Sequence, residues 1–236
     1  MRFPQYEQYI GKSKDERREK VSASPALERK RFLLSRHPEL KERLKKIHEI
    51  MKEEKAKYPE LVALTLFGSL TKGYAIPESD IDGYILIDED KILPKKPEEI
   101  DSPSVFSHIH DRIKEELKLN AEQKKNLTAY IFSGKRLPKL LTYTHDTTID
   151  IMKADQLMRF FHLSIGTGIN DYRKIILDTL ESMGKDGEKI WKNIFSHLFH
   201  FENGGLDTKL YAKRLALYPK TIQEAKKYFL HENSDL

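Results

Sequence analysis

The chain has 236 residues, of which 39% are hydrophobic and 33% charged, with a formal net charge of +5 at pH 7; this fits one large or two small globular domains. The absence of cysteine excludes disulfides, thiolate zinc sites and cysteine nucleophiles. Neither a membrane-spanning apolar run nor a signal peptide is evident, so we expect a cytoplasmic protein that makes no membrane contact.

The N-terminal region, residues 1–58, has a basic and helical pattern. Residues 1–60 hold 17 Lys and Arg against 11 Asp and Glu, whereas the remainder carries 25 against 26. The stretch ALERKRFLLSR predicts a short helix, and apolar residues recur at helical spacing from Leu40 to Met51. The basic charge favours a phosphate-rich partner, although such Lys–Glu interleaving is more often simply a solvated helix face.

The next segment, residues 59–153, has the pattern of a small α/β unit. The elements expected there are, in chain order, a strand from Leu61 to Phe67, a helical turn at TKGYA, a strand from Ile81 to Ile87, a charged Pro-rich excursion, a helix from Val105 to Leu119, and strands at LTAYIF and TTIDIMKA. Short apolar runs bounded by Gly and Pro support these assignments.

After Lys153 the pattern changes, and residues 154–236 are expected to form a helical domain. Four helices are predicted, with breaks near Gly166–Gly168, Gly184–Gly187 and Gly204–Gly205. The sequence therefore predicts the α+β class, with a small mixed β-sheet core, a helical N-terminal lead and a C-terminal helical bundle.

The stretch FGSLTKGYAIPESDID, residues 67–82, places a flexible turn ahead of two aspartates. Gly68 and Ser69 end a strand, and they offer backbone N–H groups and a hydroxyl to an anion. Asp80 and Asp82 are two residues apart, so on a strand both carboxylates point to the same side and can bind the same divalent cations. Magnesium is commonly held by a few carboxylates together with phosphate oxygens, and the turn would supply the place for that phosphate.

Carboxylates that share metal ions generally need a third, and Asp150 is the expected one. It interrupts an apolar alternating stretch between Ile149 and Ile151, where a charge is costly unless it coordinates or pairs. Asp146 and Asp88 are weaker candidates, because each sits at a strand edge beside polar residues.

The pattern G-S-x10-D-x-D, formed by Gly68, Ser69, Asp80 and Asp82, resembles the signature of the DNA polymerase β-like nucleotidyltransferase superfamily. The surrounding string is also similar to the minimal nucleotidyltransferases at Lys72-Gly73, Ala75 and Ser79. One position departs from the family pattern, since the residue after the second aspartate is usually apolar and here is Gly83. That glycine either makes room for substrate or marks a relaxed site.

The resemblance implies a two-metal magnesium site on Asp80, Asp82 and Asp150. By the same carry-over Gly68 and Ser69 hold the β- and γ-phosphates of ATP or another NTP. Lys72 is a candidate to steady the triphosphate, although a lysine in an exposed first turn is about as often plain surface. A nucleoside monophosphate then passes to an acceptor hydroxyl near the third aspartate, and pyrophosphate leaves.

The acceptor stays open at this stage. The basic lead favours an anionic acceptor such as RNA, and a protein side chain or a small molecule are the other classes. Two alternatives to this enzyme also stay open. One is a non-catalytic nucleotide-binding or partner-binding module of the same fold, and the other is an antitoxin-like nucleotidyltransferase that modifies a partner protein. The pattern does not indicate an oligomeric state.

Overall fold

The computed structural model describes residues 34, 36–94, 104–118, 126–142, 147–166 and 168–230, with side chains over these ranges except 142–151. The N-terminal half contains α3 (Pro38–Lys57), β1 (Leu61–Leu66), α4 (Ser69–Lys72), β2 (Gly83–Asp88), η2 (Glu89–Lys91), α5 (Val105–Glu116), β3 (Leu127–Phe132), η5 (Gly134–Arg136) and α6 (Leu137–Thr142). The C-terminal half contains α7 (Thr147–Met158), β4 (Leu163–Ile165), α8 (Ile169–Ser182), α9 (Lys185–Asn203), α10 (Thr208–Leu215) and α11 (Ile222–Leu230).

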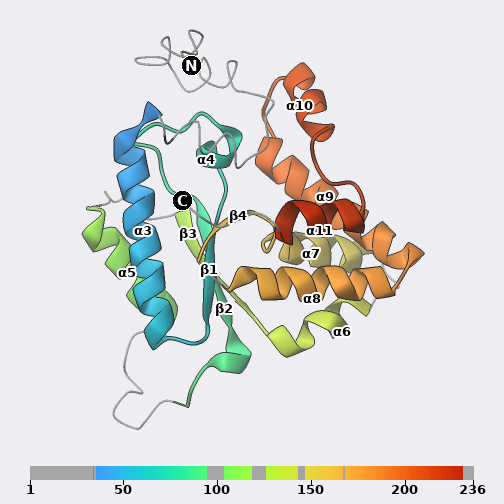
Figure 1. The fold of residues 1–236 in the computed structure, drawn as a ribbon, viewed down its shortest axis with the longest axis horizontal. Coiled ribbons are helices and arrows are strands. Elements are labelled where there is room, and N and C mark those ends of the chain that lie inside the picture. The colour runs from blue at the N-terminus through green and yellow to red at the C-terminus, as the bar shows by residue number, and fades with distance from the viewer. Residues whose placement is uncertain are drawn as a thin grey trace.

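A mixed four-stranded sheet in the order β3-β2-β1-β4 lies at the centre of the molecule. β1 pairs antiparallel with both β2 and β4, and β2 pairs parallel with β3. Helices α3 and α5 lie on one side of the sheet, and α6 to α9 with α11 lie on the other (Figure 1). This arrangement confirms the predicted α+β class, with a small mixed sheet and helices at both ends of the chain.

Burial on both faces explains why β1 is apolar except for Thr65. All six of its residues are buried, because its side chains enter two different cores. Leu61 and Leu64 join the core under α3 and α5, whereas Val62 and Ala63 join the core formed with the C-terminal helices around Trp191. The core under α3 and the core under the C-terminal helices both contain residues of β1, so the same strand packs against both sets of helices. The predicted domain boundaries after residues 58 and 153 stay a prediction.

The strand predicted at TTIDIMKA is wrong, because residues 147–158 form α7. Three of its apolar residues, Ala154, Leu157 and Met158, are buried at helical spacing, which is the period that a helix needs to keep one face in the core. The alternation of Ile149 and Ile151 is too short to distinguish a strand from a helix. The fourth strand of the sheet is instead β4, a three-residue element that the sequence analysis did not anticipate.

The other predicted elements agree closely with the structure. The strand at LTAYIF coincides with β3, and the helix from Val105 ends at Glu116. The breaks at the three glycine pairs separate β4 from α8, α8 from α9, and α9 from α10. The helix predicted at ALERKRFLLSR lies largely outside the described residues. Among those described, none of the helices combines the length and apolar composition needed to cross a bilayer.

Glu54, on α3, is a fully buried carboxylate at the packing surface between α3 and α5. It accepts a hydrogen bond from Lys57 Nζ at 2.9 Å and a short one from Arg112, and His108 Nε2 lies 3.1 Å from its second oxygen. Burial acts to raise the pKa of Glu54, but the hydrogen bonds from Lys57 and Arg112 outweigh it and hold the pKa below its usual 4.5.

This depressed pKa makes stability depend on pH with a definite sign. Ionised Glu54 stabilises the fold above its unfolded pKa, and that contribution is lost as the pH falls through the lower folded pKa. We expect the urea midpoint of the wild type to fall more steeply between about pH 5 and about pH 3 than that of Glu54→Gln. Glu53→Gln, at an exposed neighbour that also contacts Arg112, is the control and should keep the wild-type slope. Equal slopes for all three proteins would contradict the assignment.

Candidate functional site

The Gly68 turn connects the end of β1 to the one-turn helix α4. Gly68 has φ 72° and ψ −145°, a conformation that is almost confined to glycine. A Cβ at this position would lie only 1.8 Å from Asp82 Oδ2, so the Asp82 carboxylate fills the space that a side chain would need. In addition, the Phe67 N–H donates to the Asp82 carbonyl at 3.0 Å. The structure therefore brings the turn and the second aspartate into direct contact.

Asp80 and Asp82 lie immediately before β2 rather than inside it. The strand begins at Gly83, and the Phe67–Asp82 hydrogen bond extends its pairing with β1 by one position. Asp80 is exposed and Asp82 is half-buried. Asp82 thus stands next to the Gly68 turn, at the end of the sheet where β1 finishes and β2 starts, and Asp80 precedes it by two residues.

The loop before Asp80 is a β-turn held from helix α3. The Ser79 N–H donates to the Ile76 carbonyl at 2.9 Å, with Pro77 at the second position of the turn. Arg43, on α3, donates to the Ser79 carbonyl at 3.1 Å and makes a short hydrogen bond to the Pro77 carbonyl. Burial lowers the pKa of Arg43, and the negative charge of Asp80 partly opposes this effect. Helix α3 therefore holds in position the loop that leads to Asp80.

Lys72, the predicted triphosphate contact, reaches the C-terminal end of α9. Its ammonium donates to the Gly204 carbonyl at 3.1 Å, where the partial negative charge of the helix terminus favours a cation. Its own carbonyl accepts from Arg214 Nη2 at 2.7 Å. Lys72 is thus engaged with the helical region, and its role toward a triphosphate stays a prediction.

The position of the third carboxylate is not given by the described side chains. Asp150 lies in α7, with its side chain outside the described ones, and Asp146 lies outside the described residues. Asp88 is excluded as a partner of Asp82, since it stands six strand residues away, or roughly 20 Å. Its carboxylate instead accepts from Tyr172 Oη at 2.6 Å. Within the described ranges, no group of three or more acidic or histidine side chains could hold a metal ion.

An aromatic cluster that the sequence analysis missed borders the two aspartates. Phe67, before the glycine turn, and Tyr84, after Asp82, have ring centroids 4.9 Å apart. His162 and Phe201 complete the cluster, at 5.7 and 5.1 Å from the Phe67 ring. Tyr84 follows Asp82 by two residues, and this spacing could have placed the two side chains on the same face of the strand. His162 and Phe201 come from distant elements, and no local signal indicates them.

Arg159, at the end of α7, extends this surface with a positive charge. Its guanidinium lies over the ring of Tyr84 at 4.7 Å and over the ring of Tyr130, on β3, at 4.5 Å. Asp155 accepts from it at 3.0 Å. Burial raises the pKa of Tyr130 to about 12, while the nearby arginine acts in the opposite direction. Both tyrosines therefore stay neutral near pH 7 and present ring faces to the cation.

The chemistry of the donor set at the two aspartates fits a hard divalent cation. Asp80, Asp82 and the Ser69 hydroxyl supply only oxygen, which is the ligand type that Mg²⁺ prefers. The absence of a side chain at Gly68 also leaves the Asp82 carboxylate in its place beside the turn. These residues could hold a metal ion together with the phosphate oxygens of a substrate.

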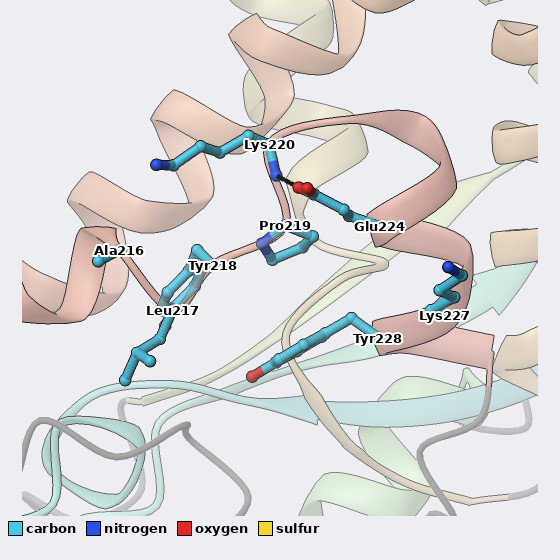
Figure 2. Close-up of a pocket in the computed structure, with 8 residues that line it drawn as sticks. All are labelled: Ala216, Leu217, Tyr218, Pro219, Lys220, Glu224, Lys227 and Tyr228. Carbon is cyan, nitrogen blue, oxygen red and sulfur yellow. Dashed lines mark hydrogen bonds between the residues drawn. The ribbon is translucent and has the colours of Figure 1, made fainter.

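A hollow with a volume of about 410 Å³ lies elsewhere, between α10 and α11. It is lined by Ala216, Leu217, Tyr218, Pro219, Lys220, Glu224, Lys227 and Tyr228 (Figure 2). Lys220 and Lys227 stand on opposite sides of the opening, and their ammonium groups do not converge (Figure 2). None of the predicted site residues lines this hollow, so the candidate site remains the end of the sheet.

Comparison with known proteins gives a family match over part of the chain. A family model described as "Polymerase beta, Nucleotidyltransferase" matches residues 45–139, from within α3 to within α6. The match contains Gly68, Ser69 and both aspartates. No curated protein and no solved structure matches the chain at a significant level.

Proposed function

We propose that the protein is a magnesium-dependent nucleotidyltransferase acting on an NTP, and the match of residues 45–139 to the polymerase β nucleotidyltransferase family model supports this. The observation that carries this proposal is the contact between the Gly68 turn and the Asp82 carboxylate. It brings together the turn proposed to bind phosphate and one of the aspartates proposed to bind metal. Asp80 precedes Asp82 by two residues, at the end of the loop that Arg43 holds.

Asp80 and Asp82 would hold the magnesium, and Asp150 is proposed as the third carboxylate of a two-metal site. When bound, the metal supplies positive charge that neutralises the phosphate oxygens. The part played by the chain itself is to position the substrates. The backbone N–H groups at Gly68-Ser69 and the Ser69 hydroxyl donate to the β- and γ-phosphates. Lys72 remains the proposed cation for the triphosphate.

The proposed reaction transfers a nucleoside monophosphate to a hydroxyl. The acceptor oxygen bonds to the α-phosphorus, and the bond from this phosphorus to the oxygen that bridges to the β-phosphate breaks. Its electron pair leaves with pyrophosphate, and the hydroxyl proton passes to a base, for which Asp150 is the predicted residue. Substitution Asp150→Asn tests that role.

We propose RNA as the acceptor and the cytoplasm as the location. The support for an RNA acceptor is electrostatic, since residues 1–60 hold 17 basic against 11 acidic side chains. A protein acceptor, as in the antitoxin-like reading, is the main competing outcome. It would be recognised by label moving to a partner protein.

A non-catalytic module of the same fold is the second candidate function. The sequence feature that favours it is the third carboxylate, because the candidate, Asp150, lies outside the G-S-x10-D-x-D motif. The departure at Gly83 no longer favours it, because packing explains that residue. A Cβ at 83 would lie 2.7 Å from both Leu64 Cδ1 and the Thr65 carbonyl oxygen, so the close approach of β1 requires glycine there.

Transfer of α-phosphate label from each of the four NTPs tests the proposal. The protein is incubated with Mg²⁺ alone, with total RNA, or with cell lysate, and the Asp80→Ala, Asp82→Ala double variant is the control. We expect label on RNA that disappears in the double variant. Magnesium-dependent NTP binding without transfer in any mixture would instead support the non-catalytic module.

A further inference from the structure

The corner between α9 and α10 holds the one-turn helix α4 from its C-terminal side. Arg214, on α10, is fully buried, and its Nη2 donates to the Lys72 carbonyl at 2.7 Å. Its Nη1 donates to Asn203 Oδ1, on the last turn of α9, at 3.0 Å. In return the Lys72 ammonium donates to the Gly204 carbonyl. Two hydrogen bonds in opposite directions therefore join α4 to this corner.

Helix α4 needs such external support because it is only four residues long. One turn of helix does not form stably on its own, since nucleation is unfavourable and its last carbonyls lack partners within the helix. Arg214 satisfies one of these carbonyls. A buried guanidinium is costly unless its donors are satisfied, so the position of Arg214 and the position of the Lys72 carbonyl are fixed together.

The same end of α9 also reaches the other side of the turn. Glu202, the neighbour of Asn203, accepts from Tyr218 Oη and lies 2.9 Å from His162 Nδ1. His162 is fully buried, and its ring packs against Phe67, the residue before Gly68. Glu202 and Asn203 thus connect to the two ends of the segment that contains Gly68 and Ser69.

From these contacts we propose that Arg214 is a positioning residue of the nucleotidyltransferase site. It acts through the Lys72 carbonyl, holds α4, and so fixes the Gly68-Ser69 turn where the phosphates are proposed to bind. The C-terminal helical region then completes a site whose motif lies wholly outside it. The effect on catalysis rests on the proposed function, whereas the effect on the turn does not.

The test compares Arg214→Lys with Arg173→Lys, a matched buried arginine. Arg173, on α8, donates to the carbonyls of Phe160 and His162 at 2.7 Å and to Asn170 and Phe229 at 3.2 Å, and these four partners all lie outside α4. Hydrogen exchange is followed at the amides of Lys72, Gly73 and Tyr74, which donate to the Gly68 and Ser69 carbonyls. We expect Arg214→Lys to speed their exchange about tenfold relative to amides in α5, which carries neither substitution, and Arg173→Lys to leave that ratio unchanged.

Steady-state transfer kinetics provide the second readout. We expect Arg214→Lys to lower kcat about 10- to 100-fold, because the turn is displaced, with a smaller change in KM for the NTP. If wild-type protein transfers no label but the exchange difference is found, the proposed function fails and the positioning role stands. Unchanged exchange at the turn in Arg214→Lys would overturn the inference, whatever the activity.

A second variant keeps the test decisive if Arg214→Lys does not fold. Lys72→Met removes only the ammonium bond to Gly204 and leaves the buried arginine in place. We expect it to speed exchange at the same three amides, though less than Arg214→Lys does. Exchange at the wild-type rate would show that the Lys72–Gly204 bond does not hold α4, and it would contradict the two-bond connection on which the proposal rests.

Discussion

Asp82→Asn is expected to lower nucleotidyl transfer about 1,000-fold or more while the protein remains folded. The amide is nearly isosteric with the carboxylate, so the packing of residue 82 against Gly68 is kept. What is lost is the negative charge that would balance a divalent cation beside the phosphates. The initial rate of α-label transfer measures the effect, and a urea unfolding curve shows whether the fold survives.

Asp88→Asn provides a control at the opposite end of the same strand. Asp88 is buried and accepts from Tyr172 Oη and the Gly134 N–H, so its substitution disturbs a hydrogen-bonded core contact. We expect it to lower the free energy of unfolding by about 1–3 kcal/mol and to leave the transfer rate per folded molecule close to wild type. An active Asp82→Asn protein, or a folded but inactive Asp88→Asn protein, would contradict the location of the site.

The part of the site that could be predicted from the sequence is the part carried by a short segment. Phe67 to Asp82 contains the turn, the loop and both aspartates, and turn chemistry acts over a few residues. Gly68 is needed for its positive φ, and Pro77 and Ser79 fit a β-turn. Local rules were therefore enough to place the turn beside the carboxylates.

The elements that could not be predicted depend on contacts between distant residues. The run Ile149 to Ile151 alternates like a strand, but burial of Leu157 and Met158 against the helical core makes it part of α7. The strand β4 has three residues and exists because it pairs with β1, which no local pattern reveals. Tertiary pairing and packing outweighed short-range pattern in both cases.

The same limit explains why the contact of Arg214 with α4 could not be predicted. In the sequence it stands in KRLALYPK, where a basic residue is most simply a solvated one. Only the fold brings it to the Lys72 carbonyl, 142 residues earlier in the chain. Its burial could have been suspected only from helical periodicity, and α10 is too short to make that period distinct.

Gly68→Ala is expected to impair both stability and transfer. An alanine must adopt φ 72° with ψ −145°, which costs about 1–3 kcal/mol. Its Cβ would also lie 1.8 Å from Asp82 Oδ2, so either the carboxylate or the turn must move. Because a displacement of about 1 Å at a reacting group can cost about 100-fold in rate, we expect at least that loss in kcat per folded molecule.

Gly184→Ala is the control that separates the free-energy cost of a strained backbone from the displacement of Asp82. Gly184 precedes α9 as Gly68 precedes α4, with a similar conformation of φ 59° and ψ −124°, yet a Cβ there would meet no atom within 4 Å. Its alanine variant should lose a comparable free energy of unfolding and keep wild-type transfer. Measured by urea unfolding and label transfer, the two variants should therefore differ mainly in activity. If Gly68→Ala kept full activity, Asp82 would not need its position beside the turn, and the proposed site would be wrong.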